Sequence, residues 1–269
     1  SQTLAFIGGG NMASAIIGGL IKQGTPPDRI VVVEPFADAR TRLNSQFGVR
    51  TLATADANLA QAGLVIWAVK PQTFKEAAQQ TRDFCANALH LSVAAGIRSD
   101  SIANWLGTQR VVRAMPNTPA LVGLGQTGLF ARTAVTPQDK AWIEQVIATT
   151  GALLWVKDES LLDAVTAISG SGPAYVFFFI EAMVEAGVKM GLTPEQATQL
   201  AIGTFEGASL LAKTATEPPS VLRERVTSKG GTTYAALTSM QNARVGELFQ
   251  VALQAAQQRA HELGDEFGA

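Results

Sequence analysis

Two glycines near the start of the chain have the spacing that nucleotide chemistry requires. Gly8 and Gly10 follow a short apolar run, and Ala13 begins a helical pattern, which gives Gly-x-Gly-x-x-Ala. Gly8 permits a tight turn, Gly10 lets the backbone approach a pyrophosphate, and Ala13 lets the helix pack close to the strand. The amides of the helix N-terminus, from Asn11 and Met12 on, face that anion. The stretch therefore predicts a dinucleotide site.

An acidic residue follows the second predicted strand. Glu34 ends the apolar run 30–33, where an acid meets the adenosine ribose in such sites. A carboxylate there repels a 2′-phosphate, so we expect NADPH or NADH as cofactor, with a preference for NADH. Arg40 or Arg42 in the next helix can offset this charge, or both can simply face solvent.

Two later loops are candidates for the rest of the cofactor site. Val69, Lys70 and Pro71 come at the end of an apolar run, where an open α/β sheet places its ligand crevice. Asn117 follows another predicted strand and can donate to and accept from a nicotinamide carboxamide. The alternative for both loops is ordinary turn chemistry, because proline and asparagine are common turn residues.

A glycine pair in the second half of the chain precedes a predicted helix. Ser228, Gly230, Gly231, Thr232 and Thr233 lie in this segment. Glycines before a helix start leave several amides free to converge on an anion. A small substrate carboxylate fits there, beside the hydroxyls of Ser228 and Thr233. The alternative is that Thr232 simply caps the helix.

Few side chains are suited to proton transfer or metal binding. The chain has two histidines, His90 in a predicted strand and His261 in a predicted C-terminal helix. We expect both to be packed or solvated rather than catalytic. Without a base for an alcohol proton, the substrate should be easier to reduce than a ketone, as an imine is. The single Cys85 excludes a multi-cysteine metal site, and we expect no metal.

Strand and helix patterns alternate up to residue 157, which predicts a Rossmann-type doubly wound α/β sheet. After Val156 the patterns are helical. We therefore expect a dinucleotide-binding Rossmann domain at 1–157 and an all-α dimerisation and substrate domain at 158–269. The predicted strands lie at 4–7, 30–33, 49–51, 64–69, 89–94, 110–114, 125–131 and 152–156.

Composition excludes several classes of partner. Net charge is −1 and no basic cluster is interleaved with aromatic residues, so no nucleic-acid partner is expected. The first residues lack the basic and apolar regions of a signal peptide. Glu181 and Glu185 interrupt the apolar run 175–188, so no membrane partner is expected. These features predict a cytoplasmic protein.

The segment Tyr175–Ile180 is apolar on every face of a helix. Such a helix must be covered on all sides. Because a small helical domain has difficulty covering it alone, we expect a second subunit to do so. The alternative is a central helix enclosed within one chain.

Five motifs stand out along the chain, at residues 6–13, 68–71, 115–120, 169–175 and 227–233. Together they resemble pyrroline-5-carboxylate reductase. That family reduces 1-pyrroline-5-carboxylate to L-proline with a nicotinamide hydride, the last step of proline biosynthesis. The resemblance implies a Rossmann domain and a helical domain interlocked with its twin in a homodimer, often assembled into a decamer.

The resemblance also implies roles for individual residues. Thr233 would be the catalytic residue that hydrogen-bonds the ring nitrogen. The carboxylate would be held by Ser228, Gly230, Gly231 and Thr232. Lys70, Pro71 and Asn117 would line the cofactor. Lys229 stands where the family usually has proline.

Two other functions compete with this interpretation. A β-hydroxyacid dehydrogenase also joins a Rossmann domain to a helical one and uses a lysine as acid/base. The lysines of the predicted helical domain are Lys189, Lys213 and Lys229, and of these three Lys229 alone lies in a predicted site. A dimer that senses the redox state of NAD(P) without catalysis would keep the glycine fingerprint but would not need Ser228 or Thr233.

Overall fold

A computed structural model describes residues 2–268 of the chain. They form two compact units, which are described separately. The first contains the residues up to Pro173 and those from Ala255 on, and the second is Ala174–Gln254. The boundary predicted after residue 157 lies between the last strand and the first helix of the helical region, whereas packing changes at Pro173. The limits of the two domains stay a prediction.

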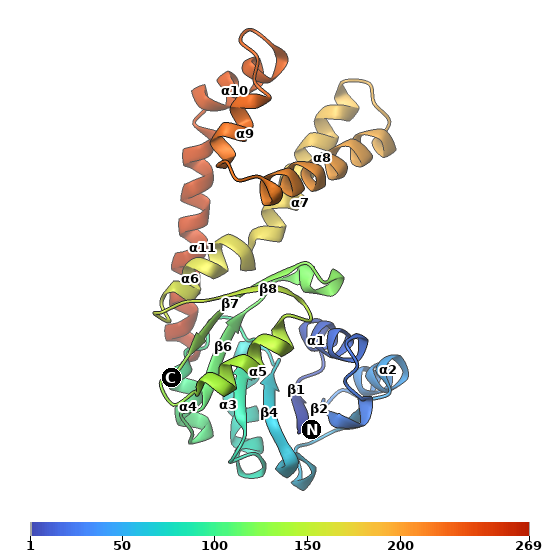
Figure 1. Ribbon diagram of the computed structural model, residues 1–269, viewed down its shortest axis with the longest axis vertical. Helices are drawn as coiled ribbons and strands as arrows, with labels where there is room; N and C mark the ends of the chain where they lie inside the picture. The colour runs from blue at the N-terminus through green and yellow to red at the C-terminus, as the bar shows by residue number, and fades with distance from the viewer. Residues whose placement is uncertain (1, 269) are drawn as a thin grey trace. The chain divides into compact units, whose positions relative to one another are not determined.

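The first unit is built on one eight-stranded sheet (Figure 1). Its strand order is β3-β2-β1-β4-β5-β6-β7-β8, parallel except where β7 runs antiparallel to β6. The order reverses between β1 and β4, which is the switch point of a doubly wound fold. All eight predicted strands are present, and the predicted fold class is confirmed. Their bounds are β1 Thr3–Ile7, β2 Ile30–Val33, β3 Arg50–Leu52, β4 Ala62–Trp67, β5 Leu89–Ser92, β6 Val111–Met115, β7 Gly125–Ala131 and β8 Gly151–Trp155.

Helices cover both faces of this sheet, and each face has its own buried core. One core contains side chains of α1, α2 and α5, and the other contains side chains of α3 and α4. This two-sided burial explains why the central strands read as continuous apolar runs. The helices are α1 Asn11–Lys22, α2 Ala37–Phe47, α3 Pro71–Thr81, α4 Ser99–Leu106 and α5 Pro137–Ile147, with short 3₁₀ helices at Pro27–Arg29, Ala57–Gln61, Arg82–Phe84 and Thr118–Val122.

The helical region begins with α6 Leu161–Val165 and a π-helix, Thr166–Gly170. In the second unit, Tyr175 and Phe179 pack edge-on against Phe249, with ring centroids 5.6 and 5.5 Å apart. Phe177 and Phe178, in helix α7, are 62% and 66% exposed, so the described residues of the chain do not enclose α7. The remaining helices are α7 Gly172–Lys189, α8 Pro194–Thr214, α9 Pro219–Arg225, α10 Thr232–Asn242 and α11 Val245–Phe267.

One helical stretch, Leu161–Lys189, is long and apolar enough to cross a membrane by length and composition alone. A single such stretch is weak evidence, because apolar helices that pack in interfaces pass the same test. Glu181 and Glu185 lie within it.

His90 is packed in the sheet, as predicted. The Trp67 Nε1–H donates to His90 Nδ1 over 3.0 Å, and His90 is 2% exposed. Burial, followed by the nearby charge of Arg110, lowers the pKa of His90 to about 4, although a hydrogen bond with the Cys85 backbone opposes this. The imidazole is therefore neutral at neutral pH and serves as an acceptor inside the core.

Acid should weaken the fold through His90. The unfolded chain binds this proton below pH 6.5 and the folded chain only below about pH 4, so stability is lost as the pH falls between these values. The pKa difference corresponds to about 3 kcal/mol. Urea unfolding of the parent and of His90→Asn, whose Oδ1 can still accept from Trp67, checks this. The variant should be less stable at pH 7 and lose less stability on acidification; equal pH slopes would contradict the assignment.

Candidate active site

The glycine fingerprint forms the turn between β1 and α1. Gly8 has φ +96°, and a Cβ added there would lie 2.4 Å from the Ala68 carbonyl oxygen. Gly10 is the N-cap of α1, and a Cβ there would meet no atom within 4 Å. The protein itself thus requires glycine at position 8. At position 10 the protein leaves open space, which is what a closely approaching pyrophosphate needs.

Alanine substitutions should separate these two roles. Gly8→Ala forces a backbone clash and should lower the unfolding temperature. Gly10→Ala should leave the unfolding temperature unchanged but raise the dissociation constant of NAD(P)H about tenfold or more, because the methyl group occupies the pyrophosphate's approach. Thermal unfolding and cofactor fluorescence titration measure the two effects. Parent-like binding by Gly10→Ala would show that the pyrophosphate lies elsewhere.

Glu34 braces the glycine turn from the end of β2. Its Oε2 accepts from the Gly9 amide over 2.8 Å and its Oε1 from the Phe36 amide over 3.0 Å. It is only 7% exposed. The Nη1 of Arg40 donates to the carbonyls of Glu34 and Pro35, each over 2.8 Å. Near the expected position of the adenosine ribose, the Arg40 guanidinium therefore bonds backbone carbonyls, whereas the Glu34 carboxylate bonds backbone amides.

The loops after β4 and β6 have different characters. Lys70 is the exposed N-cap residue of α3, with Pro71 in the first helical position. Asn117 is 8% exposed; its Nδ2 donates to the Ser169 carbonyl over 3.0 Å and its Oδ1 accepts from the Gln126 amide over 2.8 Å. Asn117 thus ties its loop to β7 and to the π-helix. One amide hydrogen remains for a ligand, and the predicted nicotinamide contact stays a prediction.

The predicted carboxylate site is the start of α10, in the second unit. Its N-cap is Gly231, without a side-chain cap, so the alternative that Thr232 caps this helix is wrong. The Gly231 amide donates to the Ser228 carbonyl over 3.0 Å, and Gly230 has φ +73°. The hydroxyls of Ser228, Thr232 and Thr233 have no hydrogen-bond partner among residues 2–268. Several donors thus stay available at one helix N-terminus.

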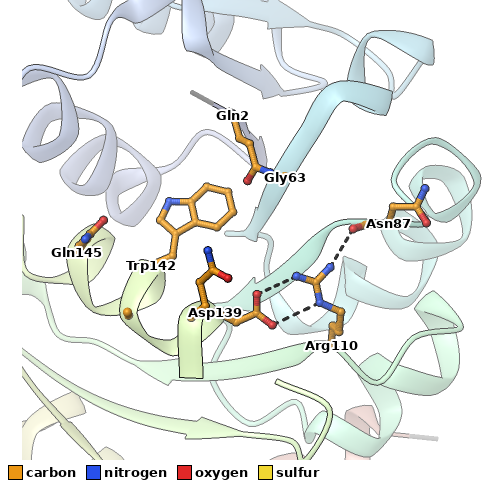
Figure 2. A pocket seen from close by; sticks show the side chains of 9 residues that line it. Gln2, Gly63, Asn87, Arg110, Asp139, Trp142 and Gln145 are labelled. Carbon is orange, nitrogen blue, oxygen red and sulfur yellow. Dashed lines mark hydrogen bonds and ion pairs between the residues drawn. The ribbon is translucent and has the colours of Figure 1, made fainter. Parts of the chain in front are cut away.

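A hollow of about 520 Å³ in the sheet unit is lined by none of the predicted site residues (Figure 2). Its lining comes from the amino ends of the parallel strands and from α5, whereas ligand crevices of open α/β sheets lie outside the carboxyl ends. Arg110, its one cation, already donates to both carboxylate oxygens of Asp139 and to the Asn87 carbonyl. The hollow is not the cofactor crevice.

Comparison with known proteins shows the family to which the chain belongs. Residues 159–263 match the family model described as pyrroline-5-carboxylate reductase dimerisation, and residues 3–96 match that of NADP oxidoreductase coenzyme F420-dependent. The chain is 42% identical to pyrroline-5-carboxylate reductase of Pseudomonas aeruginosa over 98% of both sequences. The chain belongs to the pyrroline-5-carboxylate reductase family.

Solved structures agree with this family membership. The pyrroline-5-carboxylate reductase of Coxiella burnetii is 39% identical, with a TM-score of 0.91 over 97% of this chain and 98% of that one. The Plasmodium falciparum pyrroline carboxylate reductase, solved with NADP bound, is 26% identical, with a TM-score of 0.88 over 98% of both chains.

Membership of the pyrroline-5-carboxylate reductase family also bears on assembly. The matched segment 159–263 is the dimerisation part of the family, so the chain self-associates. The exposed Phe177 and Phe178 lie within this segment. The predicted need for a second subunit is therefore confirmed at the level of self-association.

Proposed function

We propose that this chain reduces 1-pyrroline-5-carboxylate to L-proline with NADH or NADPH, the last step of proline biosynthesis. The observation that carries this function is the start of α10. It offers the hydroxyls of Ser228, Thr232 and Thr233, none engaged elsewhere among the described residues, in a chain that belongs to the family along nearly its full length.

The chain's own residues have simple roles in this reaction. The reduced nicotinamide, when bound, supplies a hydride. The turn at Gly8 and Gly10 and the amides of Asn11 and Met12 hold the pyrophosphate, with Glu34, Val69, Lys70, Pro71 and Asn117 along the rest of the cofactor.

The substrate is held at the start of α10. Ser228, Gly230, Gly231 and Thr232 hold its carboxylate, and the Thr233 hydroxyl bonds the ring nitrogen. The imine nitrogen arrives protonated, so hydride addition to the adjacent carbon yields the amine without a proton from the protein. The reaction therefore needs no contribution from His90, which is buried and neutral.

One assay separates this function from its competitors. Purified protein is mixed with 1-pyrroline-5-carboxylate and NADH or NADPH, and cofactor oxidation is followed by absorbance. Turnover only with the cyclic imine supports the reductase. Turnover of a 3-hydroxy acid but not of the imine would indicate a β-hydroxyacid dehydrogenase, and cofactor binding without any turnover would indicate a sensor.

The self-associated form is a homodimer, assembled further into a decamer, in the cytoplasm. This proposal rests on the apolar face of α7, which a second copy would cover, and on the soluble nicotinamide cofactor. No nucleic acid or membrane is expected as a partner. Light scattering of the purified protein, followed over a range of concentrations, distinguishes the dimer from the decamer.

Glu34→Ser should shift cofactor preference toward NADPH. The substitution removes a negative charge from the expected 2′-phosphate position, where charges interact by about 1 to 4 kcal/mol, and leaves Arg40 in place. It also frees the Gly9 amide, so affinity for NADH should fall. The ratio of kcat/KM for the two cofactors is the measurement. Asp38→Ser, an exposed acid of α2, is the control; an unchanged ratio in Glu34→Ser would show that Glu34 does not face the ribose.

A further inference from the structure

The loop between β5 and α4, residues 93–98, lies next to the loop that follows β4. The Val93 amide donates to the Trp67 carbonyl over 3.0 Å, and β4 and β5 are neighbours in the sheet. The fingerprint and Glu34 place the adenosine half of a dinucleotide over β1 and β2. Its other half must then extend across the switch point, over the ends of β4 and β5. Residues 93–98 therefore border the nicotinamide half.

Glu159 holds the end of this loop from 60 residues further along the chain. Its Oε1 accepts from the Ser99 amide over 2.5 Å and its Oε2 from the Ser99 hydroxyl over 2.6 Å. Ser99 is the first residue of α4, whose N-cap, Arg98, makes no side-chain cap bond. The Glu159 carboxylate thus takes the place of a local helix cap, and it fixes where the loop ends.

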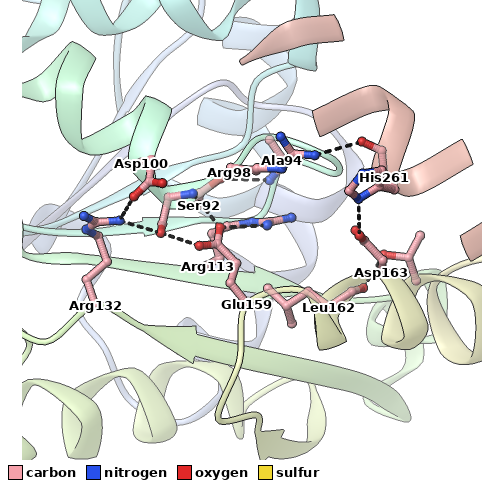
Figure 3. Close-up of polar contacts among 12 residues, drawn as sticks. Ser92, Ala94, Arg98, Asp100, Arg113, Arg132, Glu159, Leu162, Asp163 and His261 are labelled. Atoms are coloured by element: carbon pink, nitrogen blue, oxygen red, sulfur yellow. Dashed lines mark hydrogen bonds and ion pairs between the residues drawn. The ribbon is translucent and has the colours of Figure 1, made fainter. Parts of the chain in front are cut away.

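A buried arginine fixes Glu159 in turn (Figure 3). Arg113 Nη1 donates to Glu159 Oε1 over 2.9 Å, and the Arg113 side chain is 5% exposed. Among the residues that the structure describes, Glu159 is the one acceptor of this guanidinium, and Arg113 Nε has no partner. A buried cation with a single carboxylate partner holds that carboxylate strongly, because any displacement leaves the charge unpaired.

The other attachment of the loop is weaker. Arg98 reaches Asp265 over 2.7 Å and the His261 carbonyl over 3.1 Å. The Arg98 and Asp265 side chains are 36% and 64% exposed, and exposed ion pairs contribute little to stability. Of these two polar attachments, Glu159, with 21% of its side chain exposed, is therefore the stronger.

We infer that Glu159 is a positioning residue for the nicotinamide end of the cofactor, acting through Ser99 and the β5–α4 loop. This inference rests on the proposed function only for the identity of the cofactor. It requires no contact between Glu159 and any ligand. Loss of the carboxylate should weaken the binding of the nicotinamide half and spare the binding of the adenosine half.

The test compares two ligands, NADH and ADP-ribose, which lacks the nicotinamide; NADPH and 2′-phospho-ADP-ribose replace them if the parent prefers NADPH. Glu159→Ala should raise the dissociation constant of NADH about tenfold and leave that of ADP-ribose unchanged. Glu159→Gln retains an acceptor for Ser99 and should bind both as the parent does. If Glu159→Ala does not fold, Arg113→Met combined with Glu159→Ala removes the unpaired charge, with the same expected result.

Asp139→Ala is the matched control. Asp139 also accepts from an arginine, Arg110, and from a backbone amide, that of Thr136, but it lies at the amino ends of the strands. It should lower the unfolding temperature without changing the ratio of the two dissociation constants. Equal losses for both ligands, no loss for either, or a selective loss in Asp139→Ala would overturn the inference. A parent that binds NADH without reducing pyrroline-5-carboxylate refutes the proposed function alone, since the binding ratio still decides the role of Glu159.

Discussion

Thr233→Ala is expected to lower the turnover of pyrroline-5-carboxylate by about ten- to a hundredfold. The variant loses one neutral hydrogen bond to the reacting nitrogen, which is worth on the order of 1 to 3 kcal/mol. The structure supports this reason, because the Thr233 hydroxyl has no partner among the described residues and Gly231 is the N-cap of α10. The fold should therefore lose little when the hydroxyl is removed.

Three measurements make this expectation specific. Thr233→Ser should recover much of the activity, since it restores the hydroxyl. Thr238→Ala, a threonine further along α10, should turn over as the parent does. Cofactor affinity, followed by fluorescence, should be the same in all three variants. An alanine variant at the parent rate would mean that the nitrogen contact comes from water or from the backbone of the 228–232 segment.

Phe178→Asp should abolish self-association. Phe178 is 66% exposed and its ring lies 5.7 Å from that of Phe179, so the isolated chain can accept a polar side chain there. Association would bury the new charge without a partner, at a cost of roughly several kcal/mol. Other side chains of the helical region would then stay uncovered with it, including Leu210, Leu211, Leu248 and Val251, each more than half exposed.

A chain that cannot cover these side chains should unfold or aggregate rather than persist as a monomer. Light scattering and circular dichroism of Phe178→Asp, beside Phe178→Leu as an apolar control, measure this. A stable, folded monomer would refute the dependence of the fold on association. A dimer of parent stability would place Phe178 outside the interface.

Local pattern was sufficient to predict much of the fold. The predicted strands 30–33 and 125–131 have the bounds of β2 and β7, and the other six strands begin and end within two residues of their predicted positions. The antiparallel direction of β7 relative to β6 was not predicted. The short link from Met115 to Gly125 could have indicated it. A connection of that length is too short for a parallel crossover.

The contacts that brace the site could not be predicted in the same way. Glu34 bonds an amide 25 residues away, and Glu159 bonds one 60 residues away. Such pairs depend on the three-dimensional path of the chain and leave no periodic trace. One signal was available: Arg113 is a charged residue inside the apolar strand Val111–Met115, and a buried arginine requires a carboxylate from elsewhere.

Because the last residues of the chain belong to the sheet unit, this unit cannot be completed until the end of synthesis. Residues from Ala255 on pack with the sheet unit although they are made after the whole of Ala174–Gln254. The Ser101 hydroxyl, for example, donates to the Gly268 carbonyl, 167 residues later. A nascent Rossmann unit that has left the ribosome therefore still lacks the residues that fasten Arg98 and Ser101. Its strands can pair early, but the contacts of Arg98 and of α4 with the end of the chain form only when the last turns of α11 have been made.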